Sequence, residues 1–253
     1  MNDLLSVVEK TLDEVLPRED ERPSELSQAM RYAVGTGGKR VRPLIALGAA
    51  LAAGGEAKDA AYPAAAIELL HNYTLVHDDL PSMDNDEMRR GKLTVWKKFG
   101  EVNAILAGDA LQALAFLVAS KTPNNASRVV ASLAKAGVGV VAGQVEDIAA
   151  TGDTAYIYEH KTADLFVAAA EMGALAANAD DAALAKLRSF ALNLGLAFQY
   201  EDDLLDGDSP YTRTETERLA AETTDKAIRS LENLPGDVSV LKNLASKLLG
   251  RKV

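Results

Sequence analysis

The chain has 253 residues, with 27 basic and 37 acidic side chains and no cysteine. This length allows one large domain or two small ones, and the lack of cysteine excludes a disulfide scaffold, a zinc ribbon and a thiol nucleophile while fitting a reducing compartment. The net charge of −10 argues against nucleic acid or an anionic membrane surface as the main partner, and more weakly against a diphosphate ligand.

Apolar residues recur at helical spacing along most of the chain, and strand-like runs are scarce. No apolar run approaches the roughly 20 residues that span a bilayer, so no stable membrane insertion is expected. Residues 1–16 predict an acidic amphipathic helix rather than a secretory signal, which favours a soluble, cytoplasmic protein. Without a linker or a repeat, the pattern predicts a single all-helical domain over 1–253. The predicted helices are 3–16, 24–35, 42–54, 60–79, 102–119, 125–136, 138–150, 156–176, 181–206, 214–232 and 237–249.

Two adjacent aspartates, Asp78 and Asp79, end the helix predicted at 60–79. Adjacent carboxylates at the end of an otherwise apolar helix repel each other and lose hydration unless cations neutralise them. Pro81 ends the helix, so the chain can curl Asp84 back toward Asp78. Oxygen ligands without cysteine suit Mg²⁺. Taken alone, however, this cluster favours a solvated acidic helix end.

A second acidic cluster changes that interpretation. Gln199, Asp202, Asp203 and Asp206 are three and four residues apart, so they share one face of the helix predicted at 181–206. Like charges so placed destabilise an exposed helix by roughly a few tenths of a kcal/mol per pair, and a buried helix by more. Two such clusters beside apolar surface predict a divalent metal site between two helices.

Basic residues supply the other half of the predicted site. One group follows the Gly-Gly pair at 37–38, and a second follows the first acidic cluster at 89–90. A third begins a helical face at 161–162. Each alone is more often an ordinary surface charge. Together with two aspartate clusters they predict a site that holds phosphate groups through Mg²⁺ and through arginine and lysine. The basic residues are Lys39, Arg40, Arg42, Arg89, Arg90 and Lys161, and Thr162 follows the last of them.

His71 lies seven residues before Asp78, two helical turns away on the same face. A neutral imidazole at this position could donate to a second anion, although an ordinary core histidine fits the pattern equally well. Glu68 and His71 also form a Glu-x-x-His pair, which di-iron helical bundles use twice. The sequence has no second copy, so a di-iron centre is not expected.

At this point the sequence resembles the trans-isoprenyl (polyprenyl) diphosphate synthase family. The resemblance runs in the family's order from about residue 26 to 206. The long stretch from His71 to Gly91 is its most specific part. The other matching stretches are Gly-Gly-Lys-Arg-Val-Arg-Pro at 37–43, 105–111, Gly143-Gln144 to Asp147, Lys161-Thr162, and 198–206.

The resemblance implies an isoprenoid-synthase-type helical bundle around a central cavity, an expected homodimer, and condensation of isopentenyl diphosphate with an allylic diphosphate. It implies catalytic roles for Asp78, Asp84, Asp202 and Lys161, with three Mg²⁺ ions gripping the allylic diphosphate. The two acidic motifs would supply the metal ligands, Asp78, Asp79, Asp84, Asp202, Asp203 and Asp206. The residues expected to contact the allylic diphosphate are Arg89, Lys161, Thr162 and Gln199. Those expected to hold isopentenyl diphosphate are Lys39, Arg42, His71 and Arg90.

Product length is implied by the residues four and five before the first aspartate, Thr74 and Tyr73. Four residues between Asp79 and Asp84 resemble the bacterial short-chain form of the family. Tyr73 would form the floor of the pocket and favour a C15 product, farnesyl diphosphate. A plain core aromatic is the alternative for Tyr73, and because Thr74 is small, a C20 product such as geranylgeranyl diphosphate stays open.

Two stretches are shorter than the family pattern implies. One lies between Asp147 and Lys161; the other follows Asp206, where the family has a glycine-rich loop with lysines and this chain has none before Lys226. A natural deletion and a sequence lacking mobile residues both fit. A true deletion would favour a weak or inactive homologue that acts as a partner subunit. A terpene cyclase is a third hypothesis, against which the second aspartate motif and the isopentenyl residues argue.

Overall fold

The computed structural model describes residues 1–207 and 209–249, and its regular structure is helical apart from one short hairpin, which confirms the predicted all-α class. The predicted domain, 1–253, also includes residues 208 and 250–253, which lie outside the described residues. The longer helices are α1 (Asn2–Val15), α2 (Ser24–Gly35), α3 (Val41–Ala52), α4 (Ala61–Asp78), α6 (Glu101–Ala119), α7 (Ala126–Ile148), α9 (Asp164–Ala176), α10 (Asp181–Asp206), α11 (Arg213–Ser230) and α12 (Ser239–Leu249). The short ones are a 3₁₀ turn η1 (Ala57–Ala60), α5 (Val95–Phe99), α8 (Thr154–Ile157) and a π-helical turn η2 (Tyr158–Ala163).

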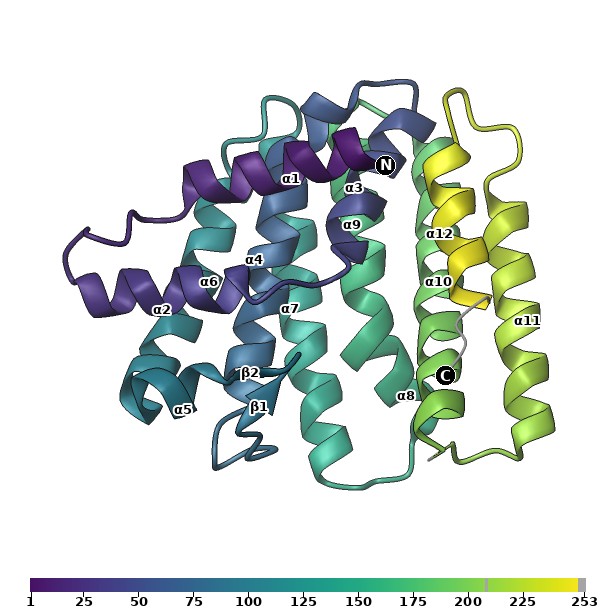
Figure 1. Cartoon of the computed structure of the whole chain (residues 1–253). Coiled ribbons are helices and arrows are strands. Elements are labelled where there is room, and N and C mark those ends of the chain that lie inside the picture. Colours follow the sequence, from purple (N-terminus) through teal and green to yellow (C-terminus); the bar gives the residue numbers. More distant parts are fainter. Residues whose placement is uncertain (208, 250–253) are drawn as a thin grey trace.

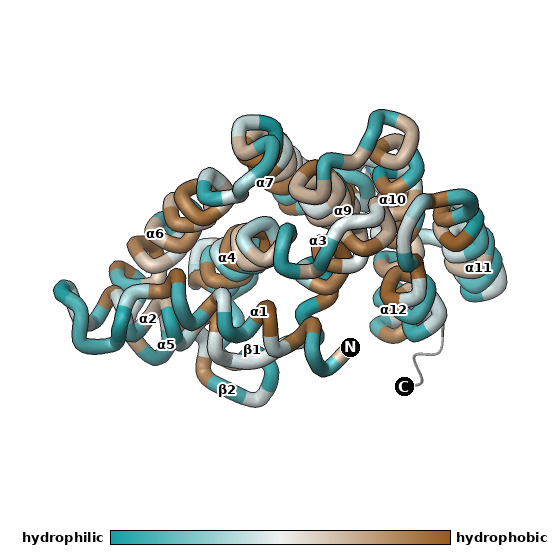
Figure 2. The backbone as a smooth tube through the Cα atoms, turned by 90° about the horizontal axis from the view of Figure 1, so that it is seen from above, coloured by the Kyte–Doolittle hydropathy of each residue, from teal (hydrophilic) through white to brown (hydrophobic). Residues whose placement is uncertain are grey.

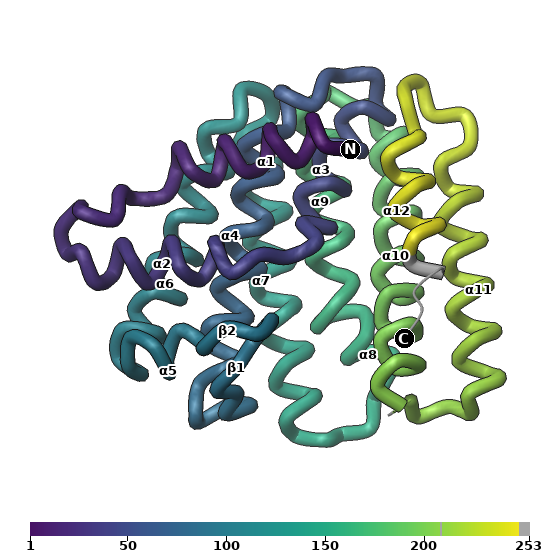
Figure 3. The backbone as a smooth tube through the Cα atoms, in the orientation of Figure 1, coloured from purple at the N-terminus to yellow at the C-terminus, as the bar shows by residue number. Residues whose placement is uncertain are grey.

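The long helices stand side by side, while α1 and α2 lie across them (Figures 1 and 3). Helix α4 packs against α3 and α6, α9 packs against α3, α7 and α10, and α10 packs against α11. Helices α4, α7 and α10 all run toward the same end of the bundle, the lower end in Figure 1. The aspartates that end α4 and α10 are therefore at the same end of the molecule.

Small residues allow the central helices to approach closely. Helices α3, α4 and α9 bury many alanines, and the largest fully buried side chains include Phe166 and Phe190. A Cβ atom on Gly173 of α9 would collide with the carbonyl oxygen of Ala46 on α3. Close helix contacts of this kind depend on the side chains at the crossing point, so alanine and glycine bring these helix axes together.

The sequence-based split between 125–136 and 138–150 is wrong, because α7 is one helix from Ala126 to Ile148. A glycine costs about 1 kcal/mol in a helix relative to alanine, yet the helix is not interrupted at Gly137, Gly139 or Gly143. A Cβ on Gly139 would collide with the Asp164 side chain, and one on Gly143 would collide with the backbone of Lys161. These glycines therefore mark close tertiary contacts rather than a helix end.

A small hairpin after α4 was not predicted. Strands β1 (Met88–Arg89) and β2 (Lys92–Leu93) pair antiparallel around Arg90 and Gly91, whose φ angles are 53° and 73°. Two successive positive φ angles are typical of a two-residue type I′ hairpin turn. The strands are too short for an alternating pattern to be recognised, and arginine in place of asparagine hides the usual turn signal.

Helices α6 and α7 are long and apolar enough to cross a membrane by length and composition alone, contrary to the expectation from the sequence. The reason is that few charges interrupt their apolar and small residues. In each, 39% of the most apolar window is buried. Figure 2 shows both helices at one edge of the bundle with strongly apolar segments. In this fold, α6 packs on α4 and α7 packs on α9.

Candidate functional site

The first acidic motif forms a tight loop at the end of α4. Helix α4 ends at Asp78, and the backbone amide of Asp84 donates a hydrogen bond to the carbonyl oxygen of Asp78 at 2.9 Å. The backbone amide of Met83 donates to the carbonyl oxygen of Leu80 at 2.8 Å and closes a further turn. The predicted return of Asp84 toward Asp78 is thus confirmed.

The carboxylates of this loop have different surroundings. Burial raises the pKa of Asp78 to about 6; the charge of Lys161 opposes this shift and that of Asp84 adds to it. Asp79 is buried, and it accepts a hydrogen bond from Nε of Arg89 at 2.7 Å. Burial raises the pKa of Asp79 as well, against the effect of Arg89. Asp78 therefore carries the less compensated charge of the two.

The hairpin brings Arg89 onto the acidic motif. Both Nε and Nη2 of Arg89 lie 2.7 Å from Oδ1 of Asp79, and Nη2 lies 3.6 Å from Asp86. The next residue, Arg90, points the other way and donates to the carbonyl oxygen of Gly37. The turn between the two strands thus directs two neighbouring arginines to two different parts of the site.

A cationic cavity of about 570 Å³ lies between α3, α4, the hairpin and α10. Arg42 donates from Nη1 to Nε2 of His71 at 3.1 Å, and its buried Nε has no hydrogen-bond partner among the described residues. Burial of Arg42 lowers its pKa to about 10. Burial of His71 and the positive charge of Arg42 both lower the pKa of His71. His71 is therefore neutral near pH 7, and the unpartnered donor of Arg42 is suited to an anionic ligand. The cavity is lined by Gly38, Lys39, Arg40, Val41, Arg42, Glu68, His71, Leu75, Arg89, Arg90, Phe198 and Asp202.

Arg40 and Glu68 bind each other, so neither side chain is free to contact a ligand. Buried Arg40, with φ 48°, donates to Glu68 at 2.8 Å, to Glu9 at 2.7 Å and to the carbonyl oxygen of Val34 at 2.9 Å. The carboxylate of Glu68 is thus engaged by a guanidinium, which agrees with the rejection of a di-iron pair from Glu68 and His71.

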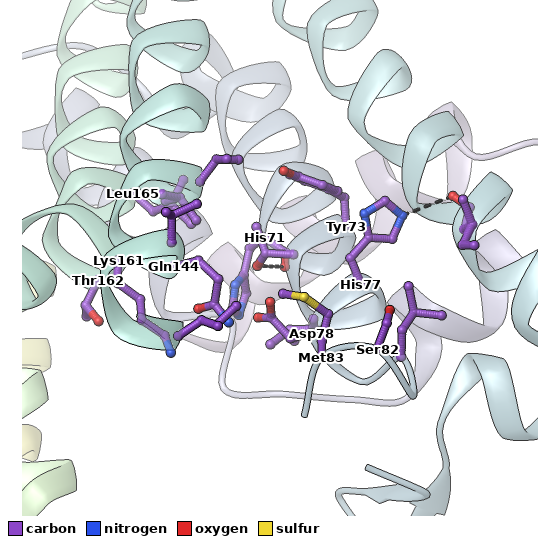
Figure 4. A pocket seen from close by; sticks show the side chains of 18 of the residues that line it. His71, Tyr73, His77, Asp78, Ser82, Met83, Gln144, Lys161, Thr162 and Leu165 are labelled. Atoms are coloured by element: carbon purple, nitrogen blue, oxygen red, sulfur yellow. Dashed lines mark hydrogen bonds between the residues drawn. The ribbon is translucent and has the colours of Figure 1, made fainter. Parts of the chain in front are cut away.

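A second, more apolar cavity of about 560 Å³ adjoins the first, and both are lined by Arg42 and His71. Figure 4 shows Lys161 and Thr162 on one side, Tyr73 and His77 on the other, and Asp78 between them. The Tyr73 ring is buried and lies edge-on to His77, with ring centroids 5.3 Å apart. His77 is fixed in turn, since its Nε2 lies 3.0 Å from the carbonyl oxygen of Ile105 on α6.

The second acidic motif is joined to η2. Thr162 donates to Oε1 of Gln199 at 2.9 Å, and Nε2 of Gln199 donates to Oδ1 of Asp203 at 2.9 Å. The other carboxylate oxygen of Asp203 accepts from the hydroxyl of Tyr158. Lys161 forms an ion pair with Asp147 on α7.

Asp202 lines the cationic cavity, whereas Asp206, the last residue of α10, is exposed.

The two acidic motifs offer carboxylate oxygens as possible magnesium ligands. Their hard oxygen donors suit Mg²⁺, and the raised pKa of Asp78 beside Asp84 indicates a site where a cation would relieve charge repulsion. Within residues 1–207 and 209–249, no three histidine, aspartate or glutamate side chains form a ready-made metal cluster. Asp79 is bound to Arg89, and Asp203 is bound to Tyr158 and Gln199. The donor chemistry fits Mg²⁺, best at Asp78 and Asp84.

Sequence reasoning gave no role to Tyr158, His77 or Asp147. His77 and Tyr73 are four residues apart, so helical spacing alone places them on one face. No comparable signal links Tyr158 to Asp203 or Asp147 to Lys161, because these contacts join different segments of the chain. All the residues predicted to bind phosphate or metal nevertheless lie at this end of the bundle.

Residues 23–217 match the polyprenyl synthetase family. The chain belongs to this family. It is 44% identical over 218 residues to a heterodimeric geranylgeranyl pyrophosphate synthase large subunit, chloroplastic, of Arabidopsis thaliana (79% of this chain, 58% of the relative), and 42% identical over 220 residues to farnesyl diphosphate synthase of Geobacillus stearothermophilus (81% and 74%). The chain thus spans less than two thirds of the plant relatives.

Solved structures share the fold over nearly the full chain. A geranylgeranyl pyrophosphate synthetase from Pyrococcus horikoshii superposes with a TM-score of 0.90 at 28% identity, covering 99% of this chain and 97% of that one. An FPP/GFPP synthase from Zymomonas mobilis superposes with a TM-score of 0.90 at 33% identity, covering 98% of both chains. The all-α polyprenyl synthetase fold expected from the sequence is therefore confirmed.

Proposed function

We propose that this chain, as one prenyltransferase domain, condenses isopentenyl diphosphate with dimethylallyl or geranyl diphosphate to give farnesyl diphosphate. The observation that carries this proposal is the pair of adjoining cavities that share Arg42 and His71. One is lined by cationic side chains and suits a diphosphate, while the other is largely apolar and suits a hydrocarbon tail. A reaction between two prenyl diphosphates needs both environments side by side.

The allylic diphosphate would bind at the mouth of the apolar cavity. Lys161, Thr162, Gln199 and Arg89 are the proposed contacts there, and the charge of Lys161 already acts to lower the pKa of Asp78. The proposed magnesium ligands are Asp78, Asp84 and Asp202, with Asp79, Asp203 and Asp206 completing the two motifs, and three ions remain the prediction. When bound, Mg²⁺ supplies neutralisation of the diphosphate charge and of the charge that builds on the departing pyrophosphate.

Isopentenyl diphosphate would bind in the cationic cavity. Lys39, Arg42 and Arg90 provide positive charge, and neutral His71 orients Arg42 through the hydrogen bond at 3.1 Å. The free Nε donor of Arg42 would then meet a phosphate oxygen. The double bond of this substrate attacks the allylic cation, and the released pyrophosphate accepts the proton. The apolar cavity walls keep water away from the cation.

Tyr73 would limit product length. Its buried ring lies among the residues of the apolar cavity, and His77 packs against it. Farnesyl diphosphate is the proposed product on this ground. Geranylgeranyl diphosphate is the second candidate, since Thr74 is small and several relatives are named geranylgeranyl pyrophosphate synthases. The cytoplasmic location also stays a prediction, because several plant relatives are named as chloroplastic.

A homodimer is the second part of this proposal. Helices α6 and α7 expose apolar side chains that include Val102, Leu106 and Val138. Ile105 and Val145 are exposed in the same way and also line the apolar cavity. A second copy packed on α6 and α7 would therefore bury this surface and close the cavity wall.

The reaction class is tested by following pyrophosphate release. We expect release only when Mg²⁺, isopentenyl diphosphate and an allylic primer are all present. Release from the allylic primer alone would favour a cyclase, which ionises a single substrate. No release under any combination would overturn the proposal and favour a non-catalytic partner subunit.

A further inference from the structure

A chain of hydrogen bonds connects η2 to the second acidic motif. It runs from the Tyr158 hydroxyl to Asp203, from Gln199 to Asp203, and from Thr162 to Gln199. Because Tyr158 and Thr162 belong to the same π-helical turn, the chain closes into a ring that spans η2 and α10. Each carboxylate oxygen of Asp203 has one partner within this ring.

Both side chains of the Tyr158–Asp203 hydrogen bond are buried. Asp203 is 6% exposed and Tyr158 is 8% exposed, so neither side chain can replace its partner freely with water. A buried carboxylate that loses one donor bears a desolvation penalty, which hydrogen bonds normally offset. The hydroxyl of Tyr158 is therefore part of what holds the Asp203 carboxylate in its present orientation.

That orientation decides which way the Gln199 amide faces. Asp203 accepts from the amide nitrogen of Gln199, so the amide oxygen turns to Thr162 and accepts its hydroxyl hydrogen. Both Gln199 and Thr162 belong to the proposed allylic diphosphate site. Tyr158 thus acts on two phosphate-binding side chains without lining either cavity described above.

The backbone of η2 is seated between two glycines. A Cβ on Gly143 of α7 would collide with the Lys161 backbone, and a Cβ on Gly195 of α10 would lie 2.7 Å from the Cα of Ala163. A π-helical turn is rare and is frequently found at functional sites. The hydroxyl of Tyr158 adds a side-chain anchor at the start of this turn, where Tyr158 also packs edge-on to Tyr200 with centroids 5.5 Å apart.

We propose that Tyr158 is a positioning residue for allylic diphosphate binding, acting through Asp203 on Gln199 and Thr162. This inference rests on the proposed function, and it assigns Asp203 a positioning role in place of direct metal ligation. Among the described residues, no hydrogen bond joins the side chain of Arg42 or His71 to this ring.

The test is Tyr158→Phe, which removes the hydroxyl and keeps the ring. We expect the KM for the allylic diphosphate to rise about tenfold, as loss of a hydrogen bond to a charged group predicts, while the KM for isopentenyl diphosphate stays within about twofold. Tyr200→Phe is the matched control, because it removes a hydroxyl from the same aromatic pair and leaves the hydrogen bond from Tyr158 to Asp203 in place. Equal KM values for the allylic substrate in wild type and Tyr158→Phe would overturn the inference.

A binding measurement separates this inference from the proposed function. Titration calorimetry with inorganic pyrophosphate and Mg²⁺ is expected to show weaker binding to Tyr158→Phe than to wild type and Tyr200→Phe. If wild type binds pyrophosphate but elongates no primer, the proposed function fails and the binding comparison still decides the role of Tyr158. If wild type binds no pyrophosphate, both fail.

A double mutant distinguishes positioning from general destabilisation. Asp203→Asn removes the charged group to which the Tyr158 hydroxyl donates. In this background, adding Tyr158→Phe is expected to raise the KM for the allylic diphosphate by less than about twofold. Fully additive effects of the two substitutions would contradict an action through Asp203.

Discussion

The amide of Asp84 lies 2.9 Å from the carbonyl oxygen of Asp78 and donates to it, so two carboxylates six residues apart share one loop. This contact follows from local sequence: α4 ends at Asp78, and Pro81 cannot continue a helix. Burial raises the pKa of Asp78 to about 6, and the charge of Asp84 adds to this shift. A cation bound beside Asp78 and Asp84 would therefore stabilise the ionised carboxylates of this loop.

The first prediction concerns the pH dependence of magnesium binding. Protons compete with the metal for Asp78, so the apparent Mg²⁺ affinity in the presence of pyrophosphate should fall as the pH drops below about 6, by about tenfold per pH unit for one proton. Titration calorimetry between about pH 5 and pH 8 measures this. An affinity independent of pH over this range would exclude Asp78 as a ligand.

The second prediction concerns the stability of the metal-free protein. The pKa of Asp78 is raised above its unfolded value, so its contribution to stability is present at low pH and is lost as the pH rises through about 6. Asp78→Asn removes the charge. The variant should therefore melt above wild type at about pH 8 and close to it at about pH 5 in the presence of a chelator. A wild type that is the more stable form at pH 8 would contradict this sign.

The third prediction concerns product length. Tyr73→Ala removes the buried ring that His77 supports, so the product should become longer by whole five-carbon units. Tyr73→Phe keeps the buried ring and loses only the hydroxyl, so its product should match that of wild type. Mass spectrometry of the products measures both. An unchanged product from Tyr73→Ala would remove Tyr73 as the floor of the cavity.

The fourth prediction concerns Arg42. Arg42→Lys keeps a positive charge but loses the planar guanidinium. In wild type one guanidinium nitrogen contacts His71, and Nε stays available to a ligand. The KM for isopentenyl diphosphate should rise at least about tenfold, with the allylic KM changed much less. Steady-state kinetics with each substrate varied in turn measures the two values. Equal increases for both substrates would argue against a separate isopentenyl site.

The fifth prediction concerns the exposed face of α6 and α7. Val138 is 72% exposed, and Val138→Glu would place a charge in the proposed dimer interface. Light scattering after size exclusion should show a dimer for wild type and a monomer for the variant. Asn243→Glu adds the same charge to an exposed position of α12 and should stay dimeric. A monomeric wild type would overturn the homodimer.

Particular residues show how far the sequence could predict this structure. The Asp78–Asp84 loop and the helix ends near 78 and 206 were predictable, because they depend on proline and on helical spacing within one segment. Gly137 was misread as a helix break, although α7 continues through it without interruption. Arg40 and Arg42 lie two residues apart at the start of α3, yet Arg40 is held by two glutamates and Arg42 faces the cavity. Which of two neighbouring arginines is free depends on partners far away in the chain.

Product mass tests the central claim most directly. Wild-type protein incubated with Mg²⁺, isopentenyl diphosphate and dimethylallyl diphosphate is predicted to give C15 diphosphate as the main product, and Asp78→Asn is predicted to give none. Recovery of both substrates unchanged from the wild-type reaction, or a product of the same length and yield from Asp78→Asn, would contradict the account.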